Sequence, residues 1–150
     1  MSTNHDVSKL DDLIITLIDS VKGYEHSADK VEAARYRDFF LAMAQERREA
    51  VTALQSTSRA LGGTPADYGS AAATLHRRLE DLRVALGGGD KAIVKEIERG
   101  EDYLKEEFER VLADERMSVA GKAAAREAYV SVRRGHDRTS ALKHQLEAAD

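Results

Sequence analysis

The chain has 150 residues, with 23 basic and 27 acidic side chains, a single proline and no cysteine or tryptophan. This length suits one domain, which buries about two thirds of the surface of its unfolded chain. The net charge of −4 argues against nucleic-acid binding, because phosphate contacts need a basic face. The missing cysteines exclude disulfides, thiolate metal sites and cysteine nucleophiles.

The hydropathy pattern predicts a cytoplasmic protein that does not interact with a membrane. Asp11 and Asp12 interrupt the first apolar run, which is therefore shorter than the apolar part of a secretory signal. No uncharged stretch reaches the roughly 18 residues that would span a bilayer.

The first half of the chain predicts two long helices, because its apolar residues repeat every ~3.6 positions. The first covers about residues 8–28, with Ser8 as its N-cap. The second covers about residues 31–61. A glycine pair ends it, and Pro65 prevents it from restarting.

The second half predicts one shorter and two longer helices. The shorter helix covers about residues 70–86 and is followed by three glycines. The next begins at an Asp90 N-cap and continues to about residue 113, and the last runs from Ser118 to about residue 146. Tight turns make each pair of long helices an antiparallel hairpin.

A long connection between the two hairpins, at about residues 62–89, contains the shorter helix. Two hairpins joined by one crossover are the ferritin-like arrangement. The sequence therefore predicts one all-α, ferritin-like four-helix-bundle domain over residues 1–150, with a fifth, shorter helix in the crossover.

Each long helix places one ionisable residue on its apolar stripe. These residues are Glu25, Arg47 with Glu46 beside it, Glu101 and His136. Burying such groups costs several kcal/mol unless they are paired or coordinated, so we expect them to be partners of one another.

If each hairpin is folded at its turn, residues equally far from the turn lie side by side. This geometry predicts two polar layers, each placed to within one helical turn. One layer combines Glu25 and His136 with Glu96 or Glu98 towards one end. The other combines Arg47, Glu46 and Glu101 nearer the middle. Three glycines within two residues of these positions interrupt the helices: Gly23, Gly100 and Gly135. They indicate either a ring, ion or backbone in close approach, or a tight crossing of helices.

Three interpretations of the polar layers remain: a dimetal centre, a single weak ion and a metal-free network. A ferritin-like dimetal centre needs Glu-x-x-His on two helices, and this chain has no such motif. The segment most similar to this motif is Arg133-Arg-Gly-His136, in which Arg133 stands where the motif has its glutamate. A single iron or other divalent ion would use Glu25, His136 and Glu98 or Glu101. The metal-free layer is the favoured interpretation.

The sequence also resembles a bacterial family of uncharacterised ferritin-like four-helix-bundle proteins, known as a domain of unknown function. The motifs that carry the resemblance are Leu10-Asp-Asp-Leu13-Ile14, Gly23-Tyr24-Glu25, Ala44-Gln45-Glu46-Arg47, Leu61-Gly62-Gly63-Thr64-Pro65, Gly69-Ser70, Leu75-His76, Gly88-Gly89-Asp90, Glu98-Arg99-Gly100-Glu101 and His136-Asp137-Arg138. The resemblance covers about residues 8–143. It implies a ferritin-like bundle and supports Glu25, His76, Glu98, Glu101 and His136 as family-pattern positions, but it implies no activity.

We therefore predict a non-enzymatic, stress-associated binding or structural protein, which forms a homo-oligomer, with a dimer favoured, and needs no cofactor. The alternative is a metal-binding ferritin-like protein with an oxidoreductase or storage role. A third hypothesis is a bundle whose crossover helix covers a small apolar ligand.

Overall fold

The computed structural model describes residues 2–69 and 88–149, and this part of the chain is all-helical. Its helices are α1 (Ser2–Lys30), α2 (Ala34–Ala60), α4 (Gly89–Leu112) and α5 (Val119–Ala148). The all-α prediction is confirmed for these residues. The shorter helix predicted over residues 70–86 lies outside them.

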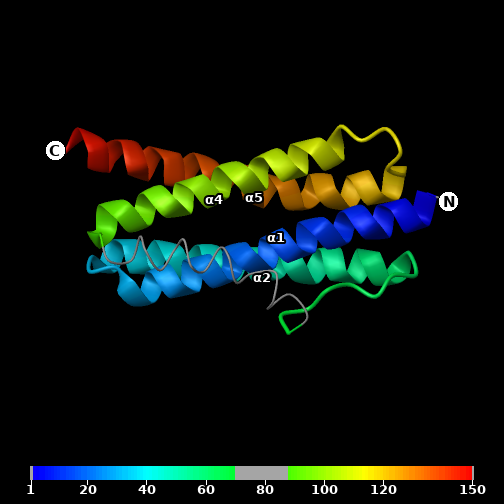
Figure 1. Cartoon of the computed structure of the whole chain (residues 1–150), viewed down its shortest axis with the longest axis horizontal. Helices are drawn as coiled ribbons and strands as arrows, with labels where there is room; N and C mark the ends of the chain where they lie inside the picture. Colours follow the sequence, from blue (N-terminus) through cyan, green and yellow to red (C-terminus); the bar gives the residue numbers. More distant parts are fainter. Residues whose placement is uncertain (1, 70–87, 150) are drawn as a thin grey trace.

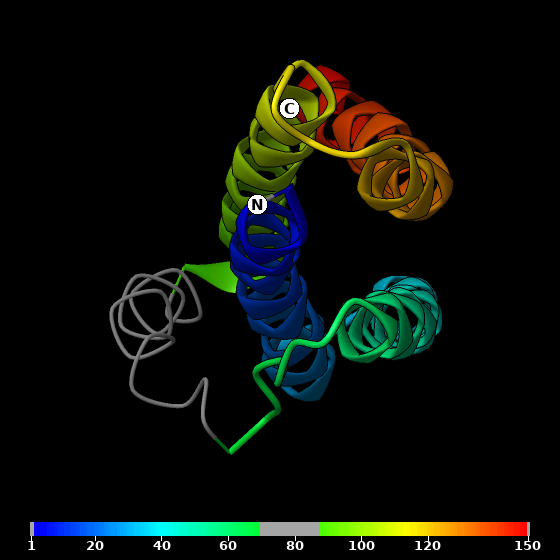
Figure 2. The same cartoon turned by 90° about the vertical axis from the view of Figure 1, so that its right-hand side faces the viewer.

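The helices pair as two antiparallel hairpins, α1 with α2 and α4 with α5 (Figure 1). Seen end-on, α1 also lies beside α4 (Figure 2), and α2 contacts α5. α2 and α4 run in the same direction, so α2 ends and α4 begins at opposite ends of the molecule. No helix in the described ranges combines the length and apolar character needed to cross a membrane.

The first helix begins earlier than the sequence predicts, at Ser2 rather than near Ser8. The added turns are held by tertiary contacts with the α4–α5 connection. Asp6 is fully buried, and its carboxylate accepts hydrogen bonds from the backbone N–H of Ser118, at 2.9 Å, and from the Ser118 hydroxyl. The same hydroxyl oxygen accepts the backbone N–H of Gly121, as an N-cap does. Asp6 therefore orients the cap of α5.

A second contact at this end joins His5 to Asp114, with 2.7 Å between Nε2 and Oδ2. The backbone N–H of Arg116 and the His5 ring both donate to this carboxylate, and they lower the pKa of Asp114 below its ordinary value of 3.8. Its ionised form is therefore stabilised in the folded state.

We expect Asp114 to make stability pH-dependent in acid. A lowered folded-state pKa gives a contribution that is present above the ordinary value and disappears as the pH falls through the folded value. The urea midpoint of the wild type should therefore fall below about pH 4, and Asp114→Asn should flatten part of that fall. Identical pH profiles for the two proteins would contradict this role.

At the opposite end, Asp90 does not cap its own helix as predicted, and neither α2 nor α4 has a side-chain cap. α4 begins at Gly89, and its N-cap is Gly88, two residues before the predicted cap. The Asp90 carboxylate accepts the backbone N–H groups of Glu32, at 2.8 Å, and Ala33, at 3.0 Å. These two groups lie directly before the first residue of α2, which is Ala34. Asp90 thus joins the beginnings of α2 and α4.

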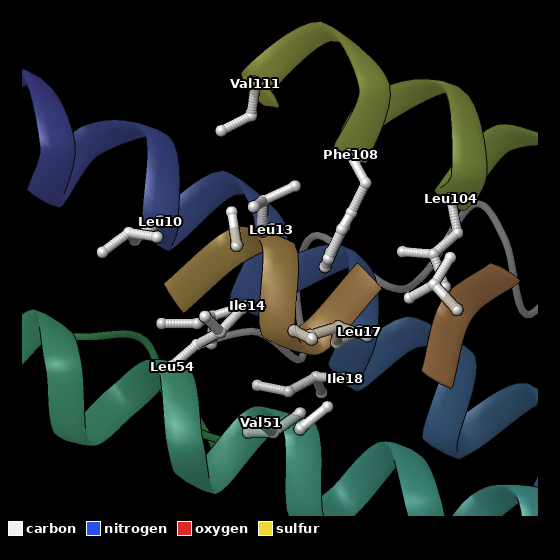
Figure 3. Close-up of a cluster of buried hydrophobic side chains, with 14 of the residues drawn as sticks. Leu10, Leu13, Ile14, Leu17, Ile18, Val51, Leu54, Leu104, Phe108 and Val111 are labelled. Atoms are coloured by element: carbon white, nitrogen blue, oxygen red, sulfur yellow. The ribbon is translucent and has the colours of Figure 1, made fainter. Parts of the chain in front are cut away.

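The apolar core consists of two clusters, one towards each end of the molecule. The first contains aliphatic residues of α1, α2 and α4, together with Phe108 and small residues of α5 (Figure 3). The second gathers around Tyr24, Phe40 and Ile93. α5 contributes mainly small buried residues: Gly121, Ala125, Ala128, Val132, Gly135 and Thr139. This narrow stripe leaves room for larger side chains from the other helices.

Candidate functional site

A buried ion pair between α2 and α4 forms the centre of the candidate site. Arg47 is 0% and Glu101 2% exposed. Nη1 of Arg47 donates to Oε1 of Glu101 at 2.8 Å, and Nη2 donates to Oε2 at 2.6 Å. Two parallel, charge-assisted hydrogen bonds of this kind fix the orientation of both groups as well as neutralising them.

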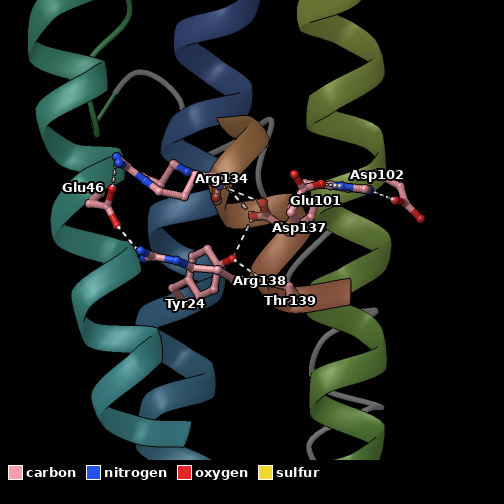
Figure 4. A network of polar contacts seen from close by, with 11 residues as sticks. Tyr24, Glu46, Glu101, Asp102, Arg134, Asp137, Arg138 and Thr139 are labelled. Carbon is pink, nitrogen blue, oxygen red and sulfur yellow. Dashed lines mark hydrogen bonds and ion pairs between the residues drawn. The ribbon is translucent and has the colours of Figure 1, made fainter. Parts of the chain in front are cut away.

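Two residues of α1 add hydrogen bonds to the pair, whereas the buried Nε of Arg47 has no partner among the described residues. The Tyr24 hydroxyl donates to Oε1 of Glu101 at 2.8 Å, and the Ser20 hydroxyl accepts from Nη1 of Arg47 at 2.8 Å. On α5, the hydroxyl of Thr139 lies 3.4 Å from that of Tyr24 (Figure 4). We call Ser20, Tyr24, Arg47, Glu101 and Thr139 the polar layer; it draws on all four helices of the described chain.

The electrostatics of the polar layer favour a charged pair beside a neutral tyrosine. Burial and the Glu101 carboxylate raise the pKa of Tyr24 well above its ordinary value of 10.0. Burial alone would lower the pKa of Arg47, but the Glu101 carboxylate, together with Tyr24 and Glu46, outweighs it and raises that pKa. Arg47 therefore stays a cation, and Tyr24 stays a hydrogen-bond donor.

Gly135 leaves the space that the Arg47 guanidinium occupies. A Cβ atom there would overlap Nη2 of Arg47 and lie 2.5 Å from Cε of Met43 and 3.2 Å from Oε2 of Glu101. The sequence predicted a close approach beside Gly135, and the group that approaches is the guanidinium of Arg47. Gly23 differs, since a Cβ there would meet no described atom within 4 Å. It lines a cavity of about 50 Å³ between α1 and α4, beside Glu101.

Three of the six predicted site residues lie at the molecular edge with other partners. Glu46 pairs with Arg134 of α5 at 2.8 Å (Figure 4), so it does not join Arg47 and Glu101. Glu25 pairs with Arg48 of the neighbouring helix. Glu98 pairs with Lys143 of α5, with 3.6 Å between Oε2 and Nζ. Each carboxylate is therefore neutralised locally.

His136 also lies outside the polar layer. Its Nε2 donates to Oδ1 of Asp102 on α4 at 2.6 Å, and the predicted contact with Glu25 is not formed. The buried stripe of α5 runs through Gly135, the preceding residue. Because a shift of one position turns a helical side chain by ~100°, His136 points along the edge between α4 and α5.

Tyr24 could not be predicted as a member of the polar layer, because two registers fit α1 equally well. Glu25 was predicted on the inward stripe, whereas Tyr24 is the buried residue, at 1% exposed. The spacing from Val21 to Ala28 accommodates either residue, as steps of three and four or of four and three. The residue types could have decided between the two registers. An aromatic side chain such as Tyr24 is buried more often than a glutamate such as Glu25.

The residues predicted to hold a metal do not converge. Among residues 2–69 and 88–149, no three His, Asp or Glu side chains are arranged to hold an ion. The oxygens of Glu101 face a guanidinium, and a positive charge at that distance opposes the binding of a second cation.

Comparison with known proteins identifies a family but no activity. No curated protein matches the chain significantly. The family model described as a domain of unknown function, DUF2383, matches residues 6–115. The match includes Tyr24, Arg47 and Glu101 and ends before α5 begins. It confirms the predicted resemblance to a domain of unknown function, and the chain belongs to the DUF2383 family.

Proposed function

We propose that this chain is a ferritin-like four-helix bundle that functions without a metal, as a non-enzymatic binding or structural protein. The observation that carries the proposal is the bidentate Arg47–Glu101 pair, fully enclosed between the two apolar clusters. In this proposal the guanidinium supplies the positive charge that a metal ion supplies in a ferritin-like dimetal centre.

The chain path supports the ferritin-like part of this proposal. Two antiparallel hairpins whose second and third long helices run in the same direction need a connection that returns along the molecule, as in ferritin-like folds. Residues 61–88 provide that connection.

The hydrogen bonding of Glu101 supports a structural role over a catalytic one. Its two oxygens accept from both Nη atoms of Arg47 and from the Tyr24 hydroxyl. A carboxylate held this way would have to break a buried ion pair before it could take a proton or bind a metal, and losing such a pair costs several kcal/mol.

Metal analysis of protein purified without chelator tests this proposal. We expect metal well below one ion per chain, and a thermal midpoint that neither EDTA nor added iron(II), manganese or zinc changes. A ligand that binds the native state would raise that midpoint. The Glu101→Gln and His136→Ala variants serve as controls. Stoichiometric metal that is lost in both variants would contradict the proposal and favour the metal-binding alternative.

Self-association into a dimer remains part of the proposal. Light scattering of the full chain at several concentrations would measure it, and a monomer at all of them would contradict it.

A further inference from the structure

A groove between the beginning of α2 and the end of α5 lies apart from the polar layer. Its volume is about 370 Å³, within the range of small-molecule sites. Its lining includes Tyr36 and Phe39 of α2 and Leu142 of α5, and no residue of the polar layer.

The floor of the groove is apolar and continuous with the core. Tyr36 is 4% exposed and belongs to the second apolar cluster. Phe39 and Leu142 pack against that cluster while remaining partly exposed. A ligand here would cover apolar surface that the fold leaves in contact with water, which favours binding.

The polar lining is positively charged. Arg35 and Arg138 line the groove, and no carboxylate does so among the described residues. This charge contrasts with the net charge of −4 of the whole chain. The groove therefore complements an anion.

Both arginines are positioned to meet an anionic head group. Arg35 donates to the Tyr36 hydroxyl at 2.8 Å, and its guanidinium lies 4.7 Å from the centre of that ring, which holds it beside the apolar floor. Arg138 is 55% exposed and forms an ion pair with Glu46, in which Nη1 lies 3.8 Å from Oε2, beyond hydrogen-bond length. Its donors are thus available for a bidentate interaction with a carboxylate.

We propose that this groove binds an amphipathic anion, a medium-chain alkyl carboxylate whose tail covers Phe39 and Leu142 and whose head group meets Arg35 and Arg138. Arginine suits this role because its planar guanidinium matches the geometry of a carboxylate. The site does not involve Arg47 or Glu101, so its test is independent of the metal-free proposal.

Titration of the isotope-labelled full chain with decanoate, followed by amide NMR shifts, tests the site. We expect saturable shifts concentrated at residues 35–39 and 138–145, with decan-1-ol binding more weakly. Arg35→Gln and Arg138→Gln should each weaken decanoate binding by roughly three- to tenfold, because each removes one exposed, charge-assisted contact.

Arg133→Gln is the matched control. Arg133 lies on α5 like Arg138, is 58% exposed and pairs with Asp137 at 3.5 Å, but it does not line the groove. This variant should bind decanoate as the wild type does. The proposal would be overturned by shifts centred elsewhere, by equal affinity for decanoate and decan-1-ol, or by unchanged affinity in both groove variants.

Discussion

Replacing Arg47 with methionine is expected to lower the free energy of unfolding by about 3–5 kcal/mol, because the change leaves the Glu101 carboxylate buried without its cation. Methionine retains much of the length and apolar stem of arginine, so the loss reports mainly on charge. Urea unfolding at neutral pH, followed by circular dichroism, measures the change.

Arg48→Met is the matched control for this prediction. Arg48 is the next residue of α2 and also pairs with a glutamate of a neighbouring helix, Glu25, but the side chains of this pair are 39% and 34% exposed. Exposed pairs contribute about 1 kcal/mol or less. Equal losses in the two variants would show that burial of the Arg47–Glu101 pair has no energetic importance.

Gly135→Ala is the second change with a large expected effect. Alanine normally stabilises a helix relative to glycine by about 1 kcal/mol, but here its methyl group would overlap the guanidinium of Arg47. Both Nη atoms are fixed by Glu101, so the arginine cannot turn away without weakening the pair. We expect a net loss of roughly 1–3 kcal/mol in the free energy of unfolding.

Gly23→Ala provides the opposite expectation within the same fold. No described atom lies within 4 Å of a Cβ at this position, so the variant should be as stable as the wild type or up to about 1 kcal/mol more stable. Chemical denaturation of both variants compares them directly. A Gly135→Ala protein as stable as Gly23→Ala would contradict the close packing around Arg47.

The sequence was sufficient to predict the four long helices, except for the first turns of α1, and the two charged members of the polar layer. Arg47 and Glu101 each stand in a stripe of large apolar residues, which leaves their register unambiguous. α5 has no such stripe, because its buried residues are mostly small. Small residues occur on both the exposed and the buried faces of helices, so they do not indicate which face is buried. His136 was consequently placed one position away from the true stripe.

The capping contacts could not be predicted, because they depend on tertiary structure. Asp90 was expected to cap its own helix, an interaction local in sequence, whereas it accepts hydrogen bonds from residues 32 and 33. Asp6 similarly contacts Ser118 from the other end of the chain. Local spacing contains no information about such partners, since only the packing of the hairpins brings them together.

The central claim, that Arg47 and Glu101 form one neutral buried unit, is tested most directly by a double-mutant cycle. The cycle compares the free energies of unfolding of Arg47→Met, Glu101→Leu and the double variant with that of the wild type. We predict that the double variant is more stable than either single variant, because neither charge is then left buried without its partner. Losses that simply add in the double variant would contradict the claim.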